Sequence, residues 1–332
     1  MIAADDAAAQ PAGSGPPKML SPVQPPAAAP APQLSIIIVT HNSAGVIAAC
    51  LRSLYRSDSE LALEIIVVDN ASSDGTVDLV RQQFAQTQVI NAGGNSGYAA
   101  GNNLGFAAAR APWLLMLNPD TEAHNGALQA MLDAAGRRPG LGMLAPRLVF
   151  ADGSLQHSTF RFPSIAQAFF GFFEKLVPLN STANGRYPAA AYEHEREVDH
   201  ILGAAVLVRR AAWEQTGGLD EGFALYFEET DWCRRAQRAG WQLWYTPDAV
   251  ITHIGAHATS RQPERSAVLF ARSQARFFRK HYGAGWYLLL KLITIAGLSY
   301  WLARSLYARM RQRIDGATLA RRTASYWHIL VS

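Results

Sequence analysis

The sequence predicts an α/β protein with a doubly wound, mostly parallel central sheet. Three observations predict this fold. Residues 34–40, 64–69 and 113–117 are dominated by consecutive apolar side chains, which is typical of parallel strands covered on both faces. A segment with apolar residues at helical spacing, residues 46–54, separates the first two runs. Polar loops follow the strands, at the edge where open α/β sheets bind ligands.

The remaining elements of the first half follow in the order that such a sheet requires. The second strand ends in a polar loop, residues 69–76, that opens a further helix. Residues 88–90 form a short third strand, and a Gly/Asn-rich loop is expected from Asn91 to Asn103. The alternation of strands and helices predicts parallel strands joined by helical crossovers.

The fourth strand stops abruptly at Asn118-Pro119-Asp120. Pro112 and Pro119 bound the apolar run, so it is short enough for a buried strand rather than a helix. Asn118 and Asp120 lie on the same side of an extended backbone, and oxygen ligands of this kind suit a hard cation bound to phosphates. On this stretch alone, an ordinary Asn-Pro-Asp turn also explains the residues.

Composition excludes several classes of protein. The chain has 332 residues, 49% of them hydrophobic, which suffices for one large α/β domain with appendages or for two domains. Two cysteines do not make a disulfide framework. The glycines of residues 93–97 do not have dinucleotide-fingerprint spacing, and no phosphate-binding Gly-Lys-Ser/Thr follows a strand. An NAD enzyme and a P-loop NTPase are therefore both disfavoured.

The two ends of the chain differ from its middle. Residues 1–33 carry eight of the seventeen prolines and are expected to form a disordered Ala/Pro-rich tail without the character of a secretory signal. Residues 34–282 are expected to form the main domain. Residues 283–332 are expected to form a basic, apolar, helical extension.

The extension predicts contact with an anionic surface. Between Arg272 and Arg322 there are eleven Lys or Arg residues and one acid, Asp315. Residues 285–303 are apolar with aromatic ends, and Lys291 interrupts them. An interfacial helix on an anionic membrane fits this pattern, while a membrane span and packing on the main domain stay open as alternatives. Nucleic acid is not an expected partner, because groove-reading and base-stacking motifs are lacking.

The chain resembles the family 2 glycosyltransferases, which have the nucleotide-sugar-binding GT-A fold. The resemblance covers roughly residues 34–282 and is closest to the rhamnosyltransferase-like branch of bacterial surface-polysaccharide enzymes. Its motifs occur in the family's order: Ser35–Asn42, Val67–Thr76, Asn95–Asn103, Leu117–Asp120, Gly203–Arg210, Gly217–Asp220 and Phe227–Arg235.

The resemblance implies a nucleotide-sugar site after the first four strands. Asp69 would accept a hydrogen bond from the imide of uracil or thymine, although a loop or capping acid is the simpler alternative. The glycines of this region could equally serve turn geometry alone. The implied nucleotide-sugar-binding residues are Thr40, Asn42, Asp69, Asn95, Gly97, Asn103 and Asn118.

The resemblance also implies a divalent cation, Mg²⁺ or Mn²⁺. Asp120 matches the metal ligand of the family's Asp-x-Asp motif, and Asn118 replaces the first aspartate. His253 matches a histidine that some members use as a further ligand, which suits Mn²⁺ better than Mg²⁺. A lone histidine after a strand is otherwise a structural residue.

Residues 228–231 carry three acids, which precede a helix expected over residues 232–239. By resemblance, Glu229 is the general base, with Glu in place of the usual Asp, and Asp231 is the runner-up. The alternative is helix capping, with an Asp231–Arg235 pair at i,i+4 spacing. Candidates for the acceptor side lie around residues 150–200: Gln156, His157, Arg161 and Asp199.

Together these expectations describe an inverting, metal-dependent glycosyltransferase at the cytoplasmic membrane face. A dTDP- or UDP-sugar, with rhamnose favoured, would be the donor, and a glycan or lipid-linked molecule the acceptor. A non-catalytic nucleotide-sugar-binding or scaffolding homologue is the alternative, because Asn118 and Glu229 depart from the family's usual residues.

Overall fold

A ten-stranded central sheet carries the fold of the computed structural model. The structure describes residues 31–58, 60–173, 176, 184–255 and 263–331; the expected tail, residues 1–33, falls almost wholly outside them. The order along the main path is β3-β2-β1-β4-β11-β6-β12-β5, with β7 beside β6 and β9 beside β12. The strands are β1 (Leu34–Thr40), β2 (Leu63–Asp69), β3 (Gln88–Asn91), β4 (Trp113–Leu117), β5 (Thr121–Ala123), β6 (Leu141–Val149), β7 (Leu155–Gln156), β9 (Arg196–Glu197), β11 (Ala205–Arg209) and β12 (Gln242–His253).

The predicted mostly parallel sheet is confirmed, with one insertion that the sequence did not reveal. β1 pairs in parallel with β2 and β4, and β2 with β3. β11 comes from much later in the chain and lies antiparallel between β4 and β6, while β12 pairs in parallel with β6. A second, two-stranded sheet joins β8 (Thr159–Phe160) and β10 (His200–Ile201).

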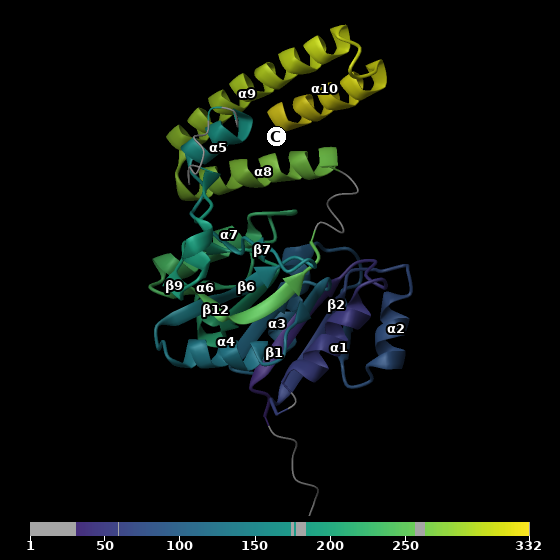
Figure 1. The fold of residues 1–332 in the computed structure, drawn as a ribbon, viewed down its shortest axis with the longest axis vertical. Helices are drawn as coiled ribbons and strands as arrows, with labels where there is room; N and C mark the ends of the chain where they lie inside the picture. The colour runs from purple at the N-terminus through teal and green to yellow at the C-terminus, as the bar shows by residue number, and fades with distance from the viewer. Residues whose placement is uncertain (1–30, 59, 174–175, 177–183, 256–262, 332) are drawn as a thin grey trace, which may run out of the picture. The chain divides into compact units, whose positions relative to one another are not determined.

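Helices cover both faces of the sheet, as Figure 1 shows. Alternate residues of β1 face opposite layers: Ile36 and Ile38 belong to one buried cluster, and Ile37 and Val39 to the other. This double burial is why the strands are continuously apolar. The helices of the main domain are α1 (Ile47–Ser57), α2 (Thr76–Gln83), α3 (Tyr98–Ala108), α4 (Ala127–Gly136), α6 (Arg210–Thr216) and α7 (Glu228–Arg238).

Helix α3 corrects the loop expected from Asn91 to Asn103, because the helix already begins at Tyr98. Its small residues are the reason that it packs so closely on β1. A Cβ at Gly105 would lie 2.4 Å from Ile37 Cγ2, and one at Gly101 would lie 2.8 Å from Val39 Cγ1. Gly101, one of the glycines that suggested a loop, is therefore a packing position in a helix, as is Gly105.

The C-terminal helices lie against one another and against α5 (Ile165–Phe172). They are α8 (Pro263–His281), α9 (Ala284–Met310) and α10 (Gly316–Leu330), and the short 3₁₀ helix η3 (Ala189–Tyr192) lies earlier in the chain. The apolar helix expected over residues 285–303 exists and is longer than expected. Among the described residues, α9 is the one helix long and apolar enough to cross a membrane.

Candidate active site

The ends of β1 and β2 place Thr40 beside Asp69, as their parallel register requires. The Thr40 hydroxyl donates to Asp69 Oδ1 at 3.0 Å, and the Ser72 N–H donates to Oδ2 at 3.0 Å. Each carboxylate oxygen can accept a second hydrogen bond. Asp69 is only 3% exposed, so it is a fixed acceptor at the edge of the sheet.

Two neighbouring loops border Asp69. Asn42 has a positive φ of 54° and accepts a hydrogen bond from the Ser73 N–H at 2.8 Å. Gly97 has a φ of +91°, a conformation that favours glycine, and its N–H donates to Asn95 Oδ1 at 3.2 Å. Asn70, directly after β2, donates from Nδ2 to Gly97 O at 2.9 Å, which holds this second loop beside the end of β2.

Asn103, also predicted to bind the nucleotide sugar, has its side chain engaged with residues 219–221. It lies inside α3, and its Oδ1 accepts from the Leu219 N–H at 2.8 Å. Its Nδ2 is 2.9 Å from both Leu219 O and Glu221 Oε1. The side chain thus joins α3 to residues 219–221.

The candidate metal centre forms because β12 ends beside the turn that follows β4. His253 pairs with Thr121 in the antiparallel β5–β12 register, which brings His253 Nε2 to 3.4 Å from Asp120 Oδ1. Asn118 Nδ2 is also 3.4 Å from His253 Nε2. The structure therefore brings together the three residues expected here.

The pKa of Asp120 and the orientation of His253 both suit a cation. Burial opposes ionisation of Asp120, but the hydrogen bond and charge of His253 outweigh it, so the pKa is lowered. His253 Nδ1 lies 3.0 Å from Gln156 Oε1. Because a carbonyl oxygen can only accept, Nδ1 carries a proton, and Nε2 is the ring nitrogen that faces Asp120.

This donor set fits a divalent cation that is also bound by a diphosphate. Among the described residues, no three or more His, Cys, Asp and Glu side chains form a metal cluster. Mg²⁺ on phosphate substrates typically has one or two protein ligands, the rest being phosphate oxygens and water. Asp120 supplies one carboxylate for such a site, and the imidazole of His253 would suit Mn²⁺ better than Mg²⁺.

Tyr98 connects this centre to the acids of α7. Its hydroxyl lies 3.0 Å from Asn118 Oδ1 and 2.7 Å from Gly203 O. Burial raises the pKa of Tyr98, and the nearby charges of Glu228, Glu229 and Asp120 raise it further. Tyr98 therefore remains a neutral phenol among three acidic side chains.

One oxygen of the Glu229 carboxyl has no partner. Its Oε2 is shielded from solvent and, among the described residues, has no hydrogen-bond partner; the same holds for Glu228 Oε2. Burial raises the pKa of Glu229 to about 7. Burial and the charge of Glu229 raise the pKa of Glu228 well above its ordinary value. A carboxyl that titrates near neutrality is suited to proton transfer.

The backbone before these acids is strained. Tyr226 and Phe227 both have left-handed φ values, 66° and 67°, which bulky residues rarely adopt. Helix α7 begins directly afterwards, at Glu228. The acids therefore lie within its first turn, which corrects the expected start at residue 232.

Asp231 has a different environment from Glu229. It is fully buried, and its carboxylate contacts Arg235 Nε at 2.8 Å, Lys280 Nζ at 2.7 Å and His281 Nε2 at 2.7 Å. The expected Asp231–Arg235 pair is present, and it is joined by two residues of α8. These contacts occupy the carboxylate and link α7 to α8.

Sequence reasoning did not assign Tyr98, Gln156 or Glu228 a role in this arrangement. Tyr98 lies within the Asn95–Asn103 motif, but nothing in its spacing points to Asn118. Gln156 was expected on the acceptor side, whereas its side chain contacts His253. The β6–β7 pairing that brings it there spans residues 148–156, and no local pattern reveals it.

Fold and site define a glycosyltransferase with a GT-A fold, and comparison with known proteins agrees. The family model described as Glycosyl transferase family 2 matches residues 35–194. The N-acetylglucosaminyl-diphospho-decaprenol L-rhamnosyltransferase of Mycobacterium tuberculosis is 30% identical over 297 residues, 84% of this chain and 96% of that relative. The chain therefore belongs to glycosyl transferase family 2, in the branch that contains rhamnosyltransferases.

Two further relatives are informative. Rhamnosyltransferase WbbL of Escherichia coli K12 is 27% identical over 230 residues, 67% of this chain and 83% of that relative. The mannosyltransferase PcManGT of Pyrobaculum calidifontis, solved with GDP-Man and Mn²⁺, superimposes with a TM-score of 0.54. That pair is 18% identical over 91% of this chain and 86% of the other, which shows the shared fold.

Proposed function

We propose that this protein is an inverting, metal-dependent glycosyltransferase of bacterial surface-polysaccharide synthesis. Its donor is a dTDP- or UDP-sugar, with rhamnose favoured, and its acceptor is a glycan or a lipid-linked saccharide. The single observation that carries this proposal is the buried, unpartnered Oε2 of Glu229, near the Asp120–His253 pair. The names of the mycobacterial and E. coli relatives support rhamnose.

In the proposed reaction, Glu229 accepts the proton of an acceptor hydroxyl. The hydroxyl oxygen forms a bond to the anomeric carbon while the bond from that carbon to the diphosphate oxygen breaks. A single displacement inverts the anomeric configuration. Burial, which raises the pKa of Glu229 to about 7, makes its carboxylate a stronger base than an exposed one.

The other residues of the site bind and orient the donor. Asp69 accepts from the imide N–H of the base, and the loops of Asn42 and Gly97 border the nucleoside. Asp120 and His253 would hold Mg²⁺ or Mn²⁺, which supplies positive charge for the departing diphosphate. Tyr98 fixes the side chain of Asn118 through their hydrogen bond.

The C-terminal helices attach the enzyme to the cytoplasmic membrane face in this proposal. Apolar side chains on α9 and α10 are unusually exposed, with Trp286 at 53%, Leu292 at 64% and Trp327 at 62%. Arginines flank them, and such a combination favours an anionic lipid surface.

A transfer assay with the full-length protein tests the proposal. Purified protein is incubated with Mn²⁺ or Mg²⁺, dTDP-rhamnose or UDP-sugars, and N-acetylglucosaminyl diphosphate on a short prenyl chain; mass spectrometry detects the product. We expect one donor to be used, and we expect chelation or Asp120→Asn to reduce transfer by at least about 100-fold. Metal-independent transfer, or no transfer from any donor, would refute the proposal.

A further inference from the structure

A second recess meets the site at Glu229. It is a cavity of about 550 Å³, within the range of roughly 300 to 1,000 Å³ typical of ligand sites. It lies between the Tyr226–Thr230 segment and helices α5, α8 and α9. Asp69, Asn118 and Asp120 are not among its described lining residues, so it is distinct from the proposed donor site.

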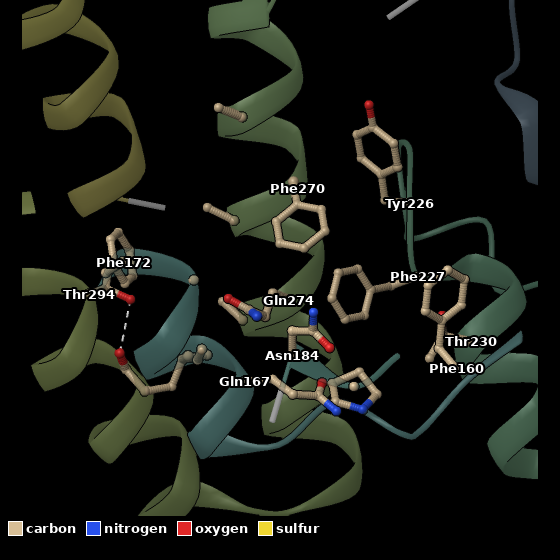
Figure 2. Close-up of a pocket in the computed structure, with 18 of the residues that line it drawn as sticks. Phe160, Gln167, Phe172, Asn184, Tyr226, Phe227, Thr230, Phe270, Gln274 and Thr294 are labelled. Atoms are coloured by element: carbon tan, nitrogen blue, oxygen red, sulfur yellow. Dashed lines mark hydrogen bonds between the residues drawn. The ribbon is translucent and has the colours of Figure 1, made fainter. Parts of the chain in front are cut away.

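The cavity has an apolar end and a polar end. Phe172, Leu290 and Trp301 line it where α5 meets α9, and Phe227 and Phe270 approach each other with ring centroids 5.2 Å apart. Figure 2 shows the rings of Phe227 and Phe270 next to each other at α8, and Phe172 and Thr294 together in another part of the cavity lining. Such walls suit a branched hydrocarbon chain rather than a sugar.

The polar end carries two arginines on adjacent chain segments. The Arg161 N–H donates to Gly185 O at 2.8 Å, and Phe160 forms a β-bridge with Arg186. Both arginine residues are exposed and line the cavity, and neither forms an ion pair with an acid of the described residues. Guanidinium groups in such a position favour a phosphate or diphosphate.

We infer that this cavity binds the polyisoprenoid diphosphate of a lipid-linked acceptor. The first isoprene units lie between α5, α8 and α9, the diphosphate contacts Arg161 and Arg186, and the attached sugar points to Glu229. This inference rests on the proposed function and specifies its acceptor. Donor and acceptor then reach Glu229 from different recesses, as a single displacement requires.

The outer face of α9 gives the lipid a route to this cavity. Leu290, Lys291 and Thr294 of α9 line the cavity, while Leu288 and Leu292 on the same helix are 60% and 64% exposed. The apolar lining is therefore close to the surface that is proposed to meet the membrane. A chain too long for the cavity can continue into lipid.

Binding of geranyl diphosphate to the full-length protein, measured by calorimetry, tests the inference. Residues 267, 270, 271, 274 and 275 of α8 line the cavity, so Ala271→Trp fills it, whereas Arg272→Trp adds the same ring outside the lining. We expect Ala271→Trp and Arg186→Ala each to weaken binding at least tenfold. Arg272→Trp should bind within about twofold of wild type.

Further ligands identify the source of the affinity. Inorganic diphosphate and geraniol should each bind at least tenfold more weakly than geranyl diphosphate, because each engages one end of the cavity. Equal binding of inorganic diphosphate, displacement of the probe by UDP or dTDP, or unchanged binding by both cavity variants would overturn the inference.

Nucleotide binding separates this inference from the proposed function. With Mn²⁺ present, UDP or dTDP should bind wild type and every cavity variant alike, which also shows that the variants are folded. Nucleotide binding without cavity-dependent binding of geranyl diphosphate would overturn the lipid site alone. Failure of wild type to bind either nucleotide would instead contradict the proposed function.

Discussion

Glu229 and Glu228 are two acids that the fold keeps close together and largely out of water. Burial stabilises their protonated forms, so the native state binds protons more tightly than the unfolded chain. The resulting contribution to stability is fully present below the ordinary carboxyl pKa. It is lost as the pH rises through the raised pKa of Glu229, about 7.

A stability measurement checks whether the contribution of Glu229 decreases as the pH rises. Relative to wild type, we expect the free energy of unfolding of Glu229→Gln to be about 1 to 3 kcal/mol larger at about pH 8 than at about pH 5. The amide stays neutral, whereas the wild-type carboxyl must ionise in a buried position. Urea denaturation at both values gives the free energies of unfolding. An exposed matched control, Glu264→Gln, should show no such gain. A pH-independent difference for Glu229→Gln would contradict the assigned environment.

Gln156 is expected to act through His253. Replacing Gln156 with Leu removes the acceptor that fixes the His253 ring, and loss of such an outer contact typically weakens metal binding about 10- to 100-fold. We therefore expect the Mn²⁺ concentration for half-maximal activity to rise by that factor at saturating donor. Gln156→Glu keeps an acceptor, so its Mn²⁺ concentration for half-maximal activity should be close to that of wild type. Identical metal dependence in Gln156→Leu and wild type would contradict this role.

At the scale of elements, Asp231 joins α7 to α8. Burial opposes its ionisation, but contacts from His281, Lys280 and Arg235 outweigh burial and lower its pKa. The stabilisation is therefore present above the ordinary carboxyl pKa and is lost as the pH falls through the lowered one.

Asp231→Ala leaves three basic groups without their shared acid. We expect it to destabilise the protein by about 3 to 5 kcal/mol at neutral pH, because breaking a buried ion pair leaves uncompensated charge. Thermal unfolding measures the loss, and nucleotide binding below the transition should persist. A fully stable Asp231→Ala variant that has lost transfer would instead make Asp231 the base.

The strands and helices that could be predicted are those marked by a pattern in the local sequence. The apolar runs of β1, β2 and β4 each lie within one short segment, so their strands were predicted within a residue or two of their ends. The start of α3 was missed because Gly101 has low helix propensity, and its packing on β1 is a contact that the local sequence does not show. β11 joins the sheet through residues about ninety positions away, which no local pattern encodes.

The sequence motifs predicted which residues belong to the candidate site, but not the side chains that these residues contact. Asp120 and His253 meet as expected, because a motif marked each of them. The partners of Asn103, Gln156 and Asp231 belong to other elements, and their contacts exist only after the sheet and α8 have assembled.

At the scale of the whole molecule, the proposed donor site and the lipid cavity meet at Glu229, and α9 carries the surface proposed to meet the membrane. Leu292→Asp places a charge on that surface, and we expect it to weaken binding to anionic phospholipid vesicles about tenfold. Leu104→Asp alters a 40% exposed leucine on α3 and is the matched control. Sedimentation with vesicles measures both, and equal binding by Leu292→Asp and wild type would contradict the attachment.

The most direct test of the central claim is the rate of sugar transfer by wild type, Glu229→Asp and Glu229→Gln across pH 5 to 9. We expect wild-type kcat/KM to fall below about pH 7, as Glu229 becomes protonated. Glu229→Asp should retain measurable transfer, whereas Glu229→Gln should lose a factor of about 100 to 10,000 in kcat with nucleotide affinity unchanged. Transfer by Glu229→Gln at the wild-type rate would contradict the account.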